Sequence, residues 1–185
     1  IAGFKTDHHA DFRHDHATPA WRVARATSAA PTYLKGHEHS ETNRIFVDGG
    51  VWANNPIMVA VIDALTAYDL KPDQIEILSI GTGNPPFELS HNKVFAGLLA
   101  WREVIKAAMF LTSDNATAQA KLLLGPNHVT RIEPTGDDAT VELDDYDRAL
   151  AELPALAAKH FDEQFAALEA FFEKAVRPRE KHYSK

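Results

Sequence analysis

The chain has 185 residues, of which 45% are hydrophobic and 24% are charged, an ordinary globular composition that fits a single domain. Its formal net charge of −7 argues against nucleic-acid binding, because phosphate contacts require clustered Lys and Arg and none precedes the C-terminal tail. The absence of cysteine excludes disulfides, thiolate nucleophiles and thiolate metal ligands.

No apolar run is long enough to cross a bilayer, and the N-terminus does not resemble a signal peptide. We therefore expect a cytoplasmic protein or one that binds peripherally to membranes. The first residue is Ile1 and not Met, which suggests that the start of the polypeptide has been removed.

The first 16 residues contain a polar stretch that is rich in histidine. It offers nitrogen and oxygen ligands that would suit zinc at His8, His9, Asp11, His14 and Asp15. Their spacing matches no metal-binding signature, so we favour a solvated, pH-responsive loop over a metal site and expect no cofactor.

A helix rich in small residues is expected next, over residues 18–30. Thr18 is suited to the N-cap, Pro19 to the first helical position, and Pro31 to the end of the helix. Side chains this small allow close packing against a neighbouring backbone. Ser28 lies within this helical run and not in a strand-to-helix elbow between glycines, which disfavours it as a nucleophile.

After a polar linker at residues 35–43, a buried strand at 45–47 ends abruptly in the sequence FVDGGVWANNP, residues 46–56. Asp48 stands at the carboxyl end of that strand, where α/β folds place their chemistry. Gly49 and Gly50 permit unusual backbone angles and close approach. Asn54, Asn55 and Pro56 complete a supporting turn. Two readings remain open: an active-site carboxylate, or a tight turn whose Asp only caps backbone amides.

The next elements are a helix to about residue 68 with almost no polar face, and a second buried strand at 75–80. The strand ends in a glycine turn at 81–86, which lacks the third glycine of a dinucleotide fingerprint and the Lys-Ser/Thr of a P-loop. Two strands joined by a buried helix predict a βαβ unit with the strands at 45–47 and 75–80 as a parallel pair.

The second half of the chain is predicted to be mainly helical. Residues 94–124 form one long helix or two, 128–132 a strand, 141–143 a short edge strand, and 144–150 and 154–176 two further helices. The large apolar side chains of these helices are read as core, with an acyl-chain pocket or a lipid-facing surface as the alternative. The basic tail, residues 177–185, is expected to fray.

Three stretches, in this order, resemble the patatin-like phospholipases: ARATSAAPTY at residues 24–33, FVDGGVWANNP at 46–56 and LSIGTG at 78–83. The resemblance implies a three-layer α/β/α fold with a largely parallel sheet. It also implies a lipid acyl hydrolase with a Ser-Asp dyad, in which Asp48 is the general base and Gly49 and Gly50 complete the motif. The substrate would be a phospholipid or another acyl lipid.

The sequence departs from that family at the nucleophile. None of the serines stands in a Gly-x-Ser-x-Gly elbow; they are Ser28, Ser40, Ser79, Ser90, Ser113 and Ser184. We therefore expect residues 1–185 to be a single partial domain, the C-terminal part of a patatin-like domain. Such a piece would expose a strand edge and the faces of Trp21, Val47 and the helix after Pro56, and would pair with a missing upstream segment or with itself.

Three functions stay open at this point. The chain supplies the catalytic Asp of a lipid acyl hydrolase, or it is a non-catalytic interaction or lipid-binding module, or its histidine-rich segment binds a metal.

Overall fold

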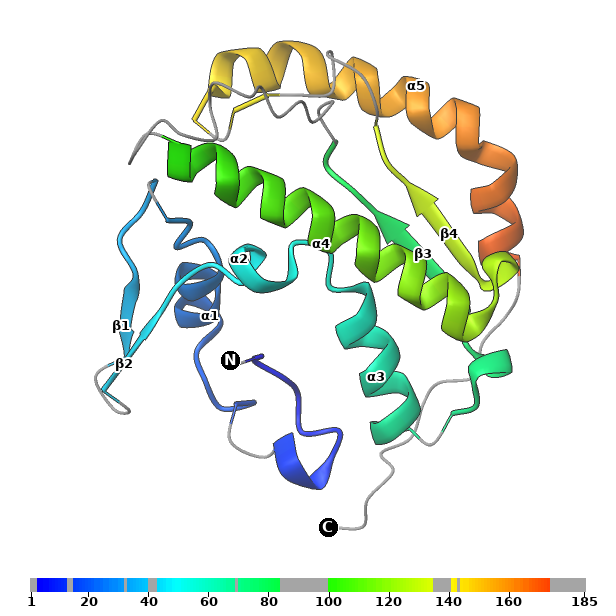
Figure 1. Ribbon diagram of the computed structural model, residues 1–185, viewed down its shortest axis with the longest axis horizontal. Coiled ribbons are helices and arrows are strands. Elements are labelled where there is room, and N and C mark those ends of the chain that lie inside the picture. The colour runs from blue at the N-terminus through cyan, green and yellow to red at the C-terminus, as the bar shows by residue number, and fades with distance from the viewer. Residues whose placement is uncertain are drawn as a thin grey trace.

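In a computed structural model of the protein, the described residues are 3–12, 15–31, 33–39, 43–68, 70–83, 100–134, 141–142 and 144–173, with the backbone alone for 100–106. Figure 1 shows their arrangement. Short helical segments are η1 (Ala10–Phe12), α1 (Ala20–Thr27), α2 (Gly50–Ala53), η2 (Pro72–Gln74) and η4 (Pro126–His128).

The described strands form two separate two-stranded sheets. β1 (His37–His39) and β2 (Arg44–Phe46) are antiparallel, with His37 opposite Phe46. β3 (Ile77–Ile80) and β4 (Val129–Ile132) are parallel, with Ile77 opposite Val129. The predicted parallel pairing of residues 45–47 with 75–80 is therefore wrong. Part of the predicted polar linker forms β1, so β2 takes a neighbour that is close in sequence, at a lower cost in loop-closure entropy.

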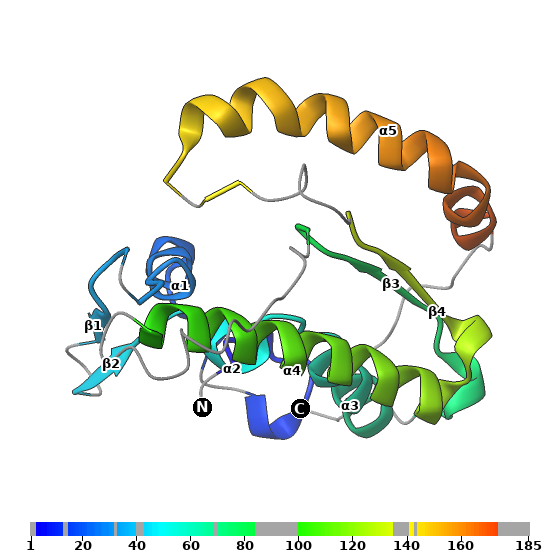
Figure 2. The ribbon, with the colours of Figure 1, turned by 45° about the horizontal axis from the view of Figure 1, so that its top comes forward.

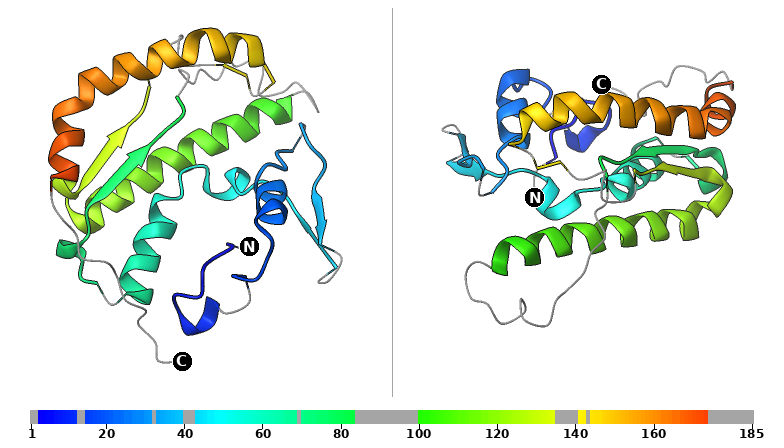
Figure 3. Two further views of the ribbon diagram at one scale, coloured as in Figure 1. Left: turned by 180° about the vertical axis from the view of Figure 1, so that it is seen from behind. Right: turned by 90° about the horizontal axis from the view of Figure 1, so that it is seen from above.

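Helices cover both faces of the parallel pair. α3 (Ile57–Ala67) and α4 (Ala100–Leu124) lie on one side of β3 and β4, and α5 (Tyr146–Phe172) lies on the other (Figures 2 and 3). This mixture of helices with a small parallel sheet confirms the predicted α/β class.

The main core lies between α3, α4 and the strand pair. Its buried members come from each of these elements and their connections: Ile57, Val61, Ile75, Ala120, Leu124 and Val129. Val61 is fully buried, and Ile57 is 4% exposed. This apolar contact fixes α3 against α4, since burial of an aliphatic side chain contributes about 1.5–3 kcal/mol.

Several element boundaries differ from the prediction. α1 begins at Ala20, so that Pro19 and not Thr18 precedes the helix. Residues 141–142 are not in a strand, and residue 143 lies outside the described residues, as do 94–99 and the basic tail.

The two helices predicted at 144–150 and 154–176 are one, because α5 continues through Pro154. Proline deprives the carbonyl four residues earlier of its N–H partner. That carbonyl belongs to Leu150, whose residue is 63% exposed, so water can replace the lost hydrogen bond. The Asp145 side chain accepts a hydrogen bond from the Arg148 amide and caps the helix start, as expected of Asp144 or Asp145.

Large apolar side chains remain exposed on several elements. Trp21, Val47 and Ile62 are 64%, 53% and 54% exposed, which confirms that these faces are uncovered. Ile62 also shows that α3 is less buried than its composition predicts. None of the described helices combines the length and apolar character needed to cross a bilayer.

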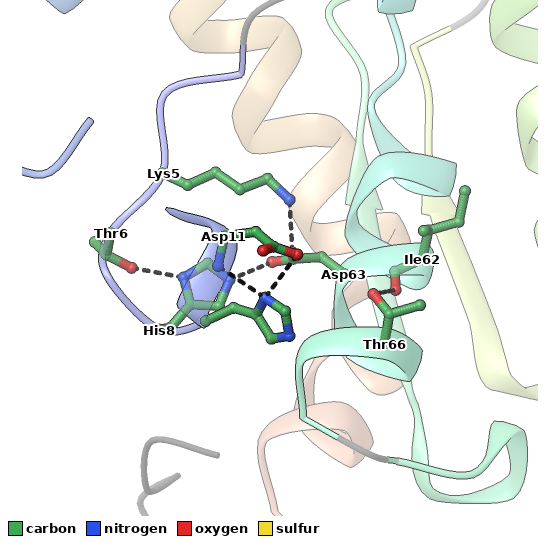
Figure 4. A network of polar contacts seen from close by, with 8 residues as sticks. Lys5, Thr6, His8, Asp11, Ile62, Asp63 and Thr66 are labelled. Atoms are coloured by element: carbon green, nitrogen blue, oxygen red, sulfur yellow. Dashed lines mark hydrogen bonds and ion pairs between the residues drawn. The ribbon is translucent and has the colours of Figure 1, made fainter. Parts of the chain in front are cut away.

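The N-terminal segment, residues 3–12, is attached to α3 through Asp63 (Figure 4). Lys5 Nζ lies 2.5 Å from Asp63 Oδ1, and His8 Nε2 lies 2.9 Å from Asp63 Oδ2. Partial burial, the largest single influence, acts to raise the pKa of Asp63. The hydrogen bonds and charges of Lys5 and His8 together outweigh burial and hold the pKa of Asp63 below its ordinary value of 3.8.

We expect Asp63 to make stability sensitive to acid. Because the pKa of Asp63 is lower in the folded chain than in the unfolded chain, the unfolded chain binds the proton more readily. The stabilisation is complete above the unfolded pKa near 4 and is lost as the pH falls through the folded pKa. Urea unfolding should show that wild type exceeds Asp63→Asn in stability at pH 6 and that this gap closes below pH 4. A gap that is constant with pH would contradict the assignment.

Candidate active site

The Asp48 turn begins directly after β2 and is tied to α1. The backbone N–H of Asp48 donates to the carbonyl oxygen of Ala29, with N and O 3.0 Å apart. Ala29 is completely buried and Ala26 is 3% exposed, so the end of α1 approaches the turn through residues with minimal side chains. The close packing predicted for this stretch therefore positions the Asp48 backbone.

The Asp48 side chain folds back over its own turn. Its Oδ1 accepts a hydrogen bond from the Gly50 N–H at 2.7 Å, an Asx-type contact. The carboxylate is half-buried. Both readings of the turn are consistent with this contact: it caps an amide, and it also fixes the plane of a carboxylate that could accept a proton.

Nearby atoms leave little room for a side chain at Gly50, whereas a side chain at Gly49 would have space. A Cβ on Gly50 would lie 3.1 Å from Asp48 Oδ1 and 3.4 Å from Met109 Cε. A Cβ on Gly49 would meet nothing within 4 Å. Neither residue adopts the unusual backbone angles that glycine permits: Gly49 has a φ of −65°, and the described glycines with positive φ are Gly83 and Gly125.

Asn55 anchors the end of the turn to α4. Its Nδ2 donates to the Ser113 carbonyl at 3.2 Å and to Thr117 Oγ1 at 2.9 Å, while its Oδ1 accepts from the Ile57 N–H at 3.2 Å. Asn55 is 6% exposed, whereas Asn54 and Pro56 are exposed. Of the predicted supporting turn, Asn55 therefore makes the structural connection.

A cavity of about 320 Å³ adjoins the turn at the carboxyl end of β3. It is lined by residues 54–57 and 77–83, together with Ala60, Ser113, Arg131 and Glu133. Asn54, which lines the cavity, also lies close to Gly50 of the motif, since its Oδ1 would be 3.5 Å from a Cβ on Gly50. The FVDGGVWANNP and LSIGTG stretches thus meet at this cavity.

Arg131 and Glu133 brace the glycine turn that closes β3. Arg131 Nη1 donates to Ser79 Oγ at 2.7 Å, and Arg131 Nη2 pairs with the Glu133 carboxylate. Glu133 Oε1 accepts from the Gly83 N–H at 2.9 Å, and the same carboxylate lies where a Gly81 Cβ would be. The Gly83 N–H, which a nucleotide phosphate would need as a hydrogen-bond donor, is therefore already bonded to the Glu133 carboxylate. The Arg131–Glu133 pair could have been predicted from the sequence, because the two residues stand two positions apart at the end of a strand and such side chains share a face.

The serines that the structure describes are Ser28, Ser79 and Ser113. Ser28 Oγ donates to the Arg25 carbonyl at 3.4 Å, Ser79 Oγ accepts from Arg131, and Ser113 is 4% exposed. Ser40, Ser90 and Ser184 lie outside the described residues.

His8 and His9, two of the described histidines of the N-terminal segment, bond to different partners. His8 bonds to Asp63, whereas His9 Nδ1 lies 3.6 Å from Asp11 Oδ2. Within the part of the chain that the structure describes, no group of three or more His, Asp or Glu side chains could hold a metal ion. His14 is not among those residues.

Comparison with known proteins supports the resemblance in the first third of the chain. Residues 2–61 match the family model of the patatin-like phospholipases. A cGAMP-activated phospholipase of Escherichia coli is 37% identical over 91 residues, 47% of this chain and 26% of that protein. Patatin-like protein 2 of Arabidopsis thaliana is 35% identical over 118 residues, 51% and 26% of the two chains.

A third relative, patatin-like phospholipase 1 of Plasmodium falciparum, is 30% identical over 115 residues, 54% of this chain and 17% of that protein. The chain thus spans about a quarter or less of the length of these relatives. No solved structure gives a significant match. The predicted resemblance to patatin-like phospholipases is confirmed, and with it a relationship to lipid hydrolases.

Proposed function

We propose that this chain supplies Asp48 as the general base of a lipid acyl hydrolase whose serine nucleophile lies on a segment outside these 185 residues. The observation that carries the proposal is that the turn containing Asp48 bonds to the first family-like stretch through its backbone and borders one cavity with the third stretch through Asn54 and Asn55. Ala29 of the first stretch binds the Asp48 backbone, and Asn54 of the second shares a cavity with residues 78–83 of the third.

The chemistry assigned to Asp48 is proton transfer in acyl transfer. The serine oxygen forms a bond to the ester carbonyl carbon while its proton passes to Asp48, and backbone amides of the absent segment stabilise the oxyanion. The proton then goes to the alcohol as it leaves. In the second half of the reaction, water gives a proton to the same carboxylate as its oxygen bonds to the acyl carbon. The bond from that carbon to the serine oxygen then breaks, Asp48 returns the proton to the serine oxygen, and the fatty acid is released. The Gly50 N–H on Oδ1 orients the carboxylate, so we assign proton acceptance to Oδ2.

The surface beside Asp48 suits an apolar substrate. Val51 and Trp52 of α2 follow the motif directly and are 47% and 52% exposed. Two of the relatives are named phospholipases, and we propose an acyl lipid, such as a phospholipid, as the substrate class. We also propose a location at a membrane surface or in the cytoplasm, with no cofactor required.

The remaining exposed apolar faces suit the nucleophile-bearing segment. Trp21 lies on α1, Val47 directly after β2 and Ile62 on α3, and a partner that covered these side chains would bury apolar surface that is now exposed. We propose that residues 1–185 are a partial domain that pairs with the missing segment. When that segment is absent, the same apolar faces would pair with a second copy of the chain.

The test compares two preparations. The 185-residue chain alone should not hydrolyse a p-nitrophenyl ester above the buffer rate, because it carries the base without the nucleophile. The same chain, joined to or mixed with its natural Gly-x-Ser-x-Gly segment, should. Turnover by the chain alone that disappears in Asp48→Ala would falsify the division of the site. A complete protein that binds lipid vesicles and lacks any esterase activity would instead favour a non-catalytic, lipid-binding module.

A further inference from the structure

The N-terminal segment contacts both elements that flank the Asp48 turn. Before the turn, the Phe4 ring packs on Phe46, the last residue of β2, with ring centroids 5.4 Å apart. After the turn, Lys5 and His8 bond to Asp63 on α3 (Figure 4). One short segment therefore links the strand that leads into the turn with the helix that follows it.

The attachment to α3 is stronger than a surface ion pair. Both carboxylate oxygens of Asp63 are engaged, and the Lys5, His8 and Asp63 side chains are only 22%, 12% and 20% exposed. His8 is itself held, because Thr6 Oγ1 lies 2.9 Å from its Nδ1 and its ring stacks on Tyr68 with centroids 5.3 Å apart. Partly buried, doubly bonded charges of this kind are less screened than exposed pairs.

β2 has little apolar packing of its own. Ile45 within β2 is 69% exposed, and Val47, the residue that follows β2, is 53% exposed. α3, by contrast, is fixed to α4 by Ile57 and Val61 in the main core. The contacts of residues 4–8 therefore connect a weakly packed strand to a firmly packed helix. This connection restrains the position of the turn that lies between the strand and the helix.

We infer that Asp63 is a positioning residue for Asp48, acting through the bridge Asp63–Lys5/His8–Phe4–Phe46 to keep β2 and α3 at a fixed separation. Asp63 touches no reacting atom. The inference rests on the proposed function of Asp48 for its catalytic meaning. The structural part of the inference, that the bridge holds the Asp48 turn in place, can be tested without measuring enzyme activity.

Amide hydrogen exchange, followed by NMR on the full 185-residue chain, reads the turn directly. The Asp48 N–H bonds to the Ala29 carbonyl and the Gly50 N–H to Asp48 Oδ1, so loosening of the turn speeds exchange at both amides. In Asp63→Asn we expect exchange roughly three- to tenfold faster at these two positions. The Gly81 N–H, bonded to the Ile132 carbonyl at the strand pair, should stay unchanged.

Two variants complete the design. Asp162→Asn removes an exposed carboxylate from α5 and should leave all three amides unchanged. Asp63→Glu keeps the charge and should recover part of the protection. If Asp63→Asn fails to fold, His8→Asn breaks one of the two bonds to Asp63 and is measured in the same way.

Two results would overturn the inference. One is unchanged exchange at Asp48 and Gly50 in a folded Asp63→Asn chain. The other is equal acceleration at Gly81, which would mean that Asp63 only stabilises the whole fold. In the hydrolase reassembled with its nucleophile segment, we expect Asp63→Asn to lower kcat about tenfold with KM unchanged. Failure of the proposed function is separate, since it would show as full activity in Asp48→Asn whatever the exchange result.

Discussion

Asp48→Asn should lower the kcat of the reassembled hydrolase by about 10³- to 10⁴-fold, because an amide cannot accept the proton of the serine hydroxyl. The change is nearly isosteric. The amide oxygen of Asn can still accept the Gly50 N–H that now bonds to Asp48 Oδ1, so the turn should keep its geometry. Loss of activity would then reflect lost proton transfer and not lost structure.

The measurement is steady-state hydrolysis of a p-nitrophenyl ester and of phospholipid vesicles, with thermal unfolding recorded for each variant. Asp73→Asn serves as the matched control, since Asp73 is an exposed aspartate in η2 and lies outside the site. Equal activity in Asp48→Asn and Asp73→Asn would remove Asp48 from the mechanism. The Asp48 motif would then be an ordinary capped turn.

The elements around Asp48 were predictable because characteristic residues mark where each element begins or ends. An apolar strand stops at Asp48, a proline precedes α3, and a glycine turn follows β3, and each of these signals acts over a few residues. The long α4 follows equally from its apolar periodicity.

What could not be predicted depends on partners distant in the sequence or on the backbone. β1 has the sequence His-Glu-His and lacks the apolar alternation of a strand, so its pairing with β2 leaves no signal. The bond from Asp48 to Ala29 involves only main-chain atoms, which any residue carries. The bridge from Lys5 and His8 to Asp63 spans 58 and 55 residues, and charge pairs at such separations have no pattern in a single sequence.

Contacts between residues distant in sequence and contacts between main-chain atoms cannot be read from the motif. The motif alone therefore could not distinguish an active-site carboxylate from a capped turn. Asp48 with its glycines describes a turn equally well with or without chemistry. The added weight comes from what the fold gathers around that turn: a buried α1 end, an asparagine fixed to α4, and a cavity at the end of β3. The bonds of Asn55 make the second of these testable as a matter of stability.

Asn55→Ala should lower the free energy of unfolding by about 3 kcal/mol. The substitution removes hydrogen-bond partners from the Ile57 N–H and from Thr117 Oγ1 in a site where Asn55 is only 6% exposed. A buried polar group left without its partner costs about 1–3 kcal/mol, more than the bond itself contributes. The side-chain volume lost at the junction of α3 and α4 adds to this cost.

Asn54→Ala is the matched control, one residue earlier in the same turn. Asn54 is exposed, so its removal should change the stability by no more than about 0.5 kcal/mol. Urea unfolding of both variants at neutral pH provides the comparison. Equal stabilities would mean that water satisfies the groups that Asn55 bonds to and that the turn is not anchored to α4. A large difference would show that the Asp48 turn and the α4 helix form one cooperative unit, as a base that must hold its position requires.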